Sequence, residues 1–93
     1  MSEYEGILIF DPELTEEERG KLEERIKEII EEGKGEIEGI TRWGRRKLAY
    51  PVKKSREGFY ILLNFKLESK ILEDITRSFR LTDSILKYLI TKK

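Results

Sequence analysis

The sequence predicts an α+β fold, a four-stranded antiparallel sheet with two helices on one face, on three observations. Short apolar runs have the alternation or β-branched content of strands, two segments repeat apolar residues at helical spacing, and turn residues separate these segments. Their order is strand, helix, strand, strand, helix, strand. Since 38% of its 93 residues are hydrophobic, we expect residues 1–93 to form one domain with one core.

The first predicted element is a strand at residues 4–10, YEGILIF. It is short, branched and aromatic, and Asp11 and Pro12 end it. Its apolar residues occupy both faces, which is typical of an inner strand.

The next segment is predicted as a helix at residues 15–32. Thr15 and Glu18 have the spacing of a capping box, and Gly33 and Gly35 are expected to supply the positive φ at which helices often end. Its apolar residues fall on one stripe: Leu22, Ile26, Ile29 and Ile30. Its many carboxylates lie among Lys and Arg, so we expect a solvated face instead of an acid–base pair or a metal site.

A second strand is predicted from residue 36 to residue 52. Ile37 and Ile40 are three positions apart, where alternation needs two or four, so the residues between them are expected to form a β-bulge. Pro51 lacks an amide donor, so this segment should lie at a sheet edge or be leaving the ladder.

The third strand is predicted at residues 59–67, after a basic link. Its core face is expected to hold Phe59, Ile61, Leu63, Phe65 and Leu67. Its other face, with Tyr60, Leu62, Asn64 and Lys66, is half apolar and suits either a wet surface or a docking face.

A second helix should begin at a Ser69 cap, before the last strand at residues 85–90. Its apolar residues are Ile71, Leu72, Ile75 and Phe79. Two strand–helix–strand units with right-handed crossovers make a ferredoxin-like split βαβ sandwich, with one sheet face left open.

Charge divides the chain in two. Residues 1–38 carry 14 acidic and 5 basic residues, and residues 39–93 carry 5 acidic and 14 basic ones, so net charges of −9 and +9 cancel. Seven cations fall between residues 42 and 56 with no acid among them: Arg42, Arg45, Arg46, Lys47, Lys53, Lys54 and Arg56. These cations repel one another unless an external anion neutralises them, and phosphate backbones are the usual anion. A Glu/Lys/Arg-rich surface of a very stable protein is the alternative explanation.

Aromatic residues lie among these cations. Trp43 either stacks on unpaired bases or packs on the hairpin stem, and both alternatives remain open. Tyr50 either stacks on unpaired bases or points into the core, and because Leu48 lies two residues before it we expect both side chains to point into the core. Gly44 and Gly58 flank the hairpin and are expected to serve a bulge or a turn.

The chain has no Cys and no His, which removes disulfides, thiol nucleophiles, imidazole bases and the commonest zinc ligands. This composition therefore excludes most familiar catalytic constellations. There is also no apolar run of roughly 18–20 residues and no signal sequence, so we expect a soluble, cytoplasmic protein without a membrane partner.

Two other functions known on this fold fit poorly. An acylphosphatase-like enzyme needs a Gly-rich anion loop with an arginine after the first strand, where this chain has DPELTEEE. An RNA-recognition motif needs a stacking aromatic where this chain has Ile61, and Phe59 and Ile61 belong to the predicted core face.

The centre of the chain contains a compact motif made of Gly44, Arg46, Leu48, Ala49, Tyr50, Pro51, Val52 and Lys53. This motif resembles the central signature of the bacterial small-subunit (30S) ribosomal protein S-six family. The likeness covers essentially the whole chain, from Tyr4 and Glu5 in the first strand to LTDSILKYLI at the end.

The resemblance implies a structural component of the small ribosomal subunit in place of an enzyme, with no cofactor, no metal and no small-molecule substrate. It would bind central-domain ribosomal RNA together with ribosomal protein S-eighteen, through the basic hairpin and the open sheet face. Arg46 and Lys53 match basic signature positions, and the other five hairpin cations are included for their charge. Lys87 is included where the family usually has Arg. For the partner protein we expect Tyr60, Leu62 and Tyr88.

One alternative is that the chain belongs to this family but lacks its function. The chain could be an engineered or truncated folding scaffold that binds neither RNA nor partner. Members commonly continue past the last strand into a tail, whereas this sequence stops at Lys93.

Overall fold

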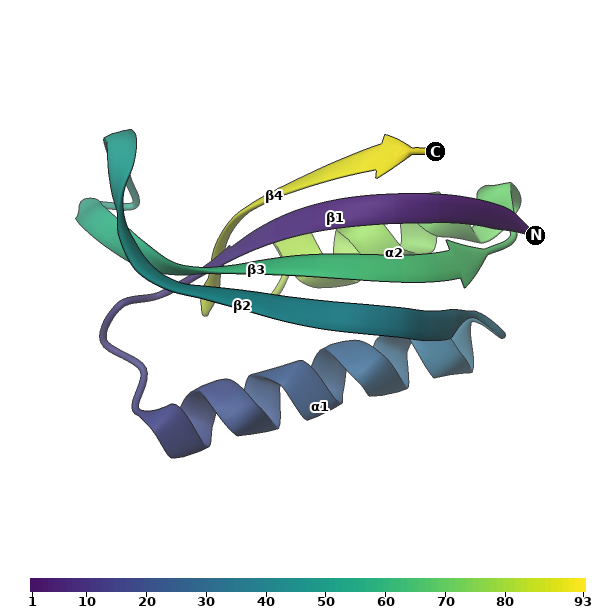
Figure 1. Cartoon of the computed structure of the whole chain (residues 1–93), viewed down its shortest axis with the longest axis horizontal. Helices are drawn as coiled ribbons and strands as arrows, with labels where there is room; N and C mark the ends of the chain where they lie inside the picture. Colours follow the sequence, from purple (N-terminus) through teal and green to yellow (C-terminus); the bar gives the residue numbers. More distant parts are fainter.

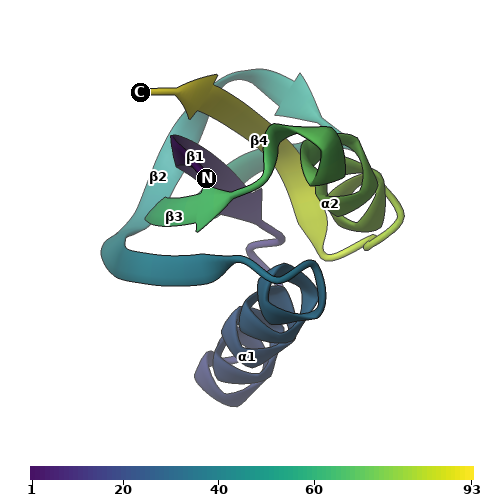
Figure 2. The same ribbon diagram turned by 90° about the vertical axis from the view of Figure 1, so that its right-hand side faces the viewer.

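The computed structural model of the protein describes residues 1–93. Its elements are, in chain order, β1 (Ser2–Phe10), α1 (Glu16–Glu32), β2 (Glu36–Val52), β3 (Ser55–Leu67), a 3-10 turn (Ser69–Ile71), α2 (Leu72–Arg80) and β4 (Ile85–Lys92). The strands form one antiparallel sheet in the order β2-β3-β1-β4. Both helices cover the same face (Figure 1, and end-on in Figure 2). The predicted α+β, ferredoxin-like fold is confirmed.

Strand β1 lies inside the sheet between β3 and β4, as its two apolar faces predicted. Tyr4 lies opposite Phe65 of β3, and their rings stack with centroids 5.5 Å apart. The core cluster draws on every long element except β2: Tyr4, Leu8, Phe10, Leu22, Ile26, Ile29, Ile30, Ile61, Leu63, Phe65, Leu67, Ile75, Phe79 and Ile85. Strand β2 adds only partly buried side chains, because it is an edge strand.

Helix α1 begins with the predicted capping box. The Glu18 amide donates to Thr15 Oγ1 at 3.2 Å, and the Thr15 amide donates to a Glu18 carboxylate oxygen at 2.9 Å. All four residues of the predicted apolar stripe are buried. The helix end was predicted wrongly: Gly33 has φ −81°, and the positive φ of 65° belongs to Lys34. No helix in the structure has the length and apolar character that crossing a bilayer requires.

Strands β2 and β3 form a long hairpin. The predicted bulge is present between Ile37 and Gly39, and Pro51 lies on an edge strand as expected. Strand β3 begins at Ser55, earlier than predicted, because the basic link is part of the hairpin. Lys53 and Lys54 both have positive φ, 48° and 68°, as the central residues of a type I′ turn do.

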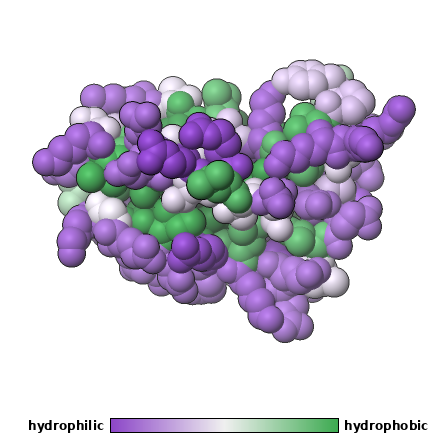
Figure 3. All heavy atoms as spheres, turned by 180° about the vertical axis from the view of Figure 1, so that it is seen from behind, coloured by the Kyte–Doolittle hydropathy of each residue, from purple (hydrophilic) through white to green (hydrophobic).

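Helix α2 is shorter than predicted. It starts at Leu72 after a 3-10 turn, and Ser69 makes no capping hydrogen bond with its side chain. Ile75 and Phe79 are buried as expected. From behind, hydrophilic side chains cover most of the molecule and hydrophobic atoms show in the middle (Figure 3).

Candidate nucleic-acid and partner interface

Residues 44–58 form a hairpin arm that leaves the sheet. The outer part of β2 bends towards the side of β4 (Figure 1). Lys47 pairs with Glu57 and Val52 pairs with Ser55, so β2 has three more residues than β3 in this interval. The extra residues curl the arm, because a bulged strand bends and twists more strongly.

Two glycines mark the base of the arm, as predicted for a bulge or turn. Gly44 has φ +82° at a second bulge of β2, which favours glycine. A Cβ on Gly58 would lie 2.4 Å from Ile9 Cγ2 and 3.0 Å from the Phe10 carbonyl oxygen. Gly58 therefore lets β3 lie close to β1 where the arm begins.

Two of the seven hairpin cations are neutralised within the chain. Arg42 makes a bidentate pair with Glu23 of α1, with nitrogen–oxygen distances of 2.9 and 2.5 Å. Its hydrogen bonds to this carboxylate raise the pKa of Arg42. Arg45 reaches Glu57 at 3.2 Å and the Pro12 carbonyl at 3.0 Å. The expectation that only an external anion could neutralise the hairpin cations is wrong for these two arginines.

Glu23 was not singled out in the sequence. Most carboxylates of α1 are exposed as predicted, but the Glu23 side chain is only 11% exposed. It follows Leu22 at the edge of the apolar stripe, where the helix meets β2. Arg42 lies opposite Ile61, on the helix-covered side of the sheet, and so comes within reach.

The base of the arm is also held by an aromatic ring. The guanidinium groups of Arg19 and Arg45 lie 3.9 and 4.9 Å from the centroid of Phe59. Arg19 also donates to the Leu14 carbonyl at 2.9 Å. These cation–π contacts attach the stem to the start of α1.

Five cations of the hairpin make no ion pair: Arg46, Lys47, Lys53, Lys54 and Arg56. Lys53 and Lys54 form the tip. Arg46 packs over Trp43, with its guanidinium carbon 5.6 Å from the ring centroid. These five residues are called the free cations below.

The two aromatic residues of the hairpin are both on the surface. Trp43 is 38% exposed, which leaves its two alternatives open. Tyr50 is 57% exposed, so the expectation that it points into the core is wrong. The curl of the arm carries it to β4, where the Lys87 ammonium donates to its hydroxyl and lies 4.7 Å from the ring centroid. Lys87, predicted to bind RNA, thus already has a partner inside the chain.

The open sheet face carries a short apolar row. Leu62 of β3 and Leu89 of β4 lie on either side of Ile7 of β1. Leu89 is 60% exposed. The neighbouring row includes Tyr60, opposite Ile9. Tyr60 and Leu62 therefore lie on the open face, as predicted for partner binding, and the prediction omitted Ile7 and Leu89.

Tyr88 was placed on the wrong face. It lies opposite Leu8, a core residue, and its ring packs edge-on against Phe79 of α2 with centroids 6.1 Å apart. The sheet register shifts at Ile9 and Phe10, which makes Leu86 an extra residue on β4. Because one extra residue reverses the face of each side chain beyond it, the open face of β4 presents Lys87 and Leu89.

Known proteins are similar to this chain in sequence and in structure. The family model "Ribosomal protein S6" matches residues 3–92. Small ribosomal subunit protein bS6 of Thermoanaerobacter pseudethanolicus is 46% identical over 99% of this chain and 97% of its own length, and that of Caldanaerobacter subterraneus is 45% identical over the same shares. The crystal structure of 30S ribosomal protein S6 from Thermotoga maritima matches with a TM-score of 0.91 at 38% identity, covering 99% of this chain and 87% of that one. The chain therefore belongs to the ribosomal protein S6 family.

Proposed function

We propose that this protein is a structural component of the small ribosomal subunit, acting in the bacterial cytoplasm and without catalytic activity. Its RNA ligand would be the central domain of small-subunit ribosomal RNA, bound together with ribosomal protein S-eighteen. The single observation that carries this proposal is the set of free cations. They gather on an arm that leaves the sheet, whereas the arginines at its base are neutralised by acids of the chain.

The free cations suit phosphate contacts. An arm of this kind can reach an RNA backbone without the core having to approach it. Each contact releases condensed counterions, so RNA affinity should fall steeply with salt. Arg42 and Arg45 contribute less in this proposal, because binding phosphate would cost their existing ion pairs.

The open sheet face is the proposed site for the partner protein. Tyr60, Leu62, Ile7 and Leu89 offer apolar and aromatic surface on three adjacent strands. Lys87 lies at the margin of this face and donates a hydrogen bond to Tyr50 of the arm, so the face and the arm are adjacent. A partner seated here would lie beside RNA bound to the free cations.

A titration at two salt concentrations tests the proposal. The chain is mixed with S-eighteen and a central-domain RNA fragment, and binding is compared with that of a Lys53→Glu/Lys54→Glu variant. A Lys27→Glu/Lys70→Glu variant is the matched control, since it changes net charge equally at exposed, unpaired positions away from the arm. We expect a slope of about one logarithmic unit per phosphate contact for the parent, and a large loss only for the arm variant.

Two outcomes would contradict the proposal. Equal losses in both variants would mean that the arm has no special role. No binding by a well-folded parent chain would favour the alternative of a family scaffold without RNA or partner binding.

A further inference from the structure

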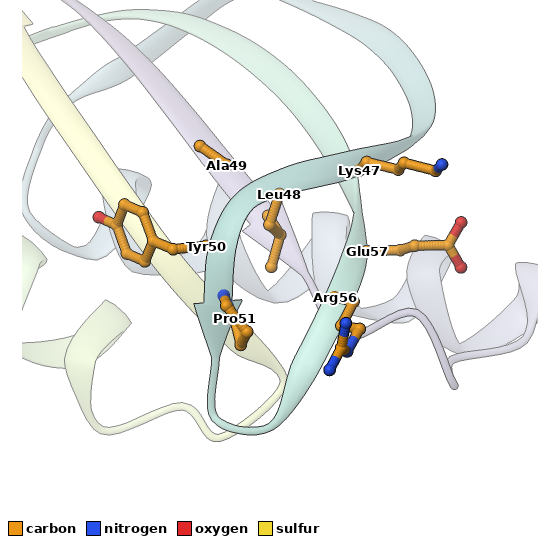
Figure 4. A pocket seen from close by; sticks show the side chains of 7 residues that line it. All are labelled: Lys47, Leu48, Ala49, Tyr50, Pro51, Arg56 and Glu57. Atoms are coloured by element: carbon orange, nitrogen blue, oxygen red, sulfur yellow. The ribbon is translucent and has the colours of Figure 1, made fainter.

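The hairpin arm contains a hollow of about 480 Å³. It opens where β2 has three residues more than β3, so its existence follows from the irregular register. Leu48, Tyr50 and Pro51 line it from β2, and Arg56 and Glu57 line it from β3 (Figure 4). Its volume falls within the roughly 300–1,000 Å³ of sites that hold small organic groups.

The lining combines an apolar wall with cations. Lys47 also borders the hollow, and neither Lys47 nor Arg56 makes an ion pair. The one acid present, Glu57, is occupied by Arg45. In Figure 4 the Lys47 and Glu57 side chains point to one side of the arm, while the Tyr50 ring points to the other. A planar apolar group with an attached anion would match this lining.

Tyr50 is held in place before any ligand arrives. The Lys87 ammonium binds its hydroxyl and lies against its ring, across 37 residues of sequence. Much of the side chain is nevertheless exposed. A fixed aromatic side chain loses little conformational entropy when a ligand stacks on it.

We propose that this hollow binds one unpaired nucleotide of the RNA. Its base would lie against Tyr50 and Leu48, and its phosphate would be held by Arg56. Paired bases in an A-form helix are stacked and out of reach, so an apolar hollow can serve only a base that has left the stack. Lys87 acts here as a positioning residue for Tyr50. This inference rests on the proposed function, because it names the RNA element that the arm selects.

The test uses two RNA hairpins that differ only by one unpaired nucleotide in the stem. We expect the parent chain to bind the bulged RNA on the order of tenfold more tightly, as stacking of one base on an aromatic side chain allows. Tyr50→Ala should abolish this preference and leave affinity for the fully paired RNA unchanged. Tyr50→Phe, which keeps the ring, should retain most of the preference.

A further variant separates positioning from charge. Lys87→Met should reduce the preference for the bulged RNA, whereas Lys92→Met, which removes the same charge further along β4, should not. Folding of each variant is checked from its unfolding transition, and the Tyr50 ring signals are followed by NMR during each titration.

The outcomes separate the two proposals. If the parent binds both RNAs equally, or Tyr50→Ala weakens both alike, the nucleotide site is overturned while RNA binding by the arm stands. If neither RNA binds, both proposals fall.

Discussion

The β2–β3 hairpin has an inner part, which contains Arg42 and Arg45, and an outer part, which contains the free cations. Both parts are rich in basic residues, but these residues make different interactions. In the inner part, arginines face acids: Arg42 pairs with Glu23 and Arg45 with Glu57. In the outer part, the free cations make no ion pair, and the one acid near them, Glu57, is paired with Arg45. The inner strands pair over α1 with only single-residue bulges, whereas the outer strands differ by three residues and bend away.

This difference shows that counting basic residues in the sequence overestimates how many of them are available to bind phosphate. All seven cations belong to one basic run of the sequence, but two of them support the fold. A cation that already has a carboxylate gains less from phosphate than one that has none, because the internal pair must first be broken. Stability and binding should therefore respond to different substitutions in this hairpin.

The largest effect on stability is expected where the two parts meet. Gly58→Val should lower the free energy of unfolding by about 2–3 kcal/mol, because overpacking against Ile9 and the Phe10 carbonyl forces β3 away from β1. Gly39→Val is the control, since nothing lies within 4 Å of a Cβ at that position. The free energy of unfolding of both variants is measured by urea denaturation. Similar losses in the two would show that close approach at Gly58 is unimportant.

Next in size is removal of the acid that holds Arg42. Glu23→Ala should cost about 1 kcal/mol, at the upper end for surface pairs, because the contact is bidentate and the Glu23 carboxylate is largely buried. It should also free Arg42 and steepen the salt dependence of RNA binding by about one unit. Glu24→Ala removes an exposed neighbour without an ion pair and should change neither quantity. An unchanged slope in Glu23→Ala would mean that Arg42 lies outside the RNA footprint.

A smaller effect should separate stability from binding at the tip. Lys53→Asn/Lys54→Gly places the preferred residues of a type I′ turn where both φ angles are positive, and should stabilise the fold by about 0.5 kcal/mol. The same variant should weaken RNA binding and lower its salt slope by about two units. Thermal unfolding and RNA titration measure the two changes. Parallel changes in stability and affinity would contradict the division between the two parts.

The smallest effect concerns the capping box at the start of α1. Hydrogen bonds from Thr15 lower the pKa of Glu18, with a smaller contribution from Lys21. A lowered pKa in the folded state stabilises the fold above the unfolded value of about 4.3, and this contribution is lost as the pH falls through the folded value. The stability difference between the parent and Glu18→Gln should therefore shrink in acid. Glu16→Gln, in the same turn but not bonded to Thr15, should show less pH dependence, and RNA affinity should be unaffected.

Local patterns predicted most of the fold. The capping box at Thr15, the alternating core face of β3 and the bulge after Ile37 are all encoded within a few residues. The end of α1 was missed because a lysine adopts the positive φ expected of a glycine. The short α2 was missed because Ser69 opens a 3-10 turn instead of capping the helix.

The candidate site was less predictable because its contacts join distant residues. Tyr50 meets Lys87, and Arg42 meets Glu23, across 37 and 19 positions. Periodicity indicates which face a side chain occupies, but it does not indicate which residue of another element lies opposite. The misplacement of Tyr88 has a related cause, since a single extra residue in β4 reverses the alternation.

The inner position of β1 also has a consequence for the order in which the chain folds. Both neighbours of β1, β3 and β4, are synthesised after it, and Tyr4 finally pairs with Lys92. During translation, at about 5–20 residues per second, the apolar faces of β1 therefore have no strand to pair with until β3 emerges. The four-stranded sheet can form completely only after β4 has been synthesised. This member of the ribosomal protein S6 family therefore cannot complete its sheet until β4, which is synthesised after the other three strands, is available.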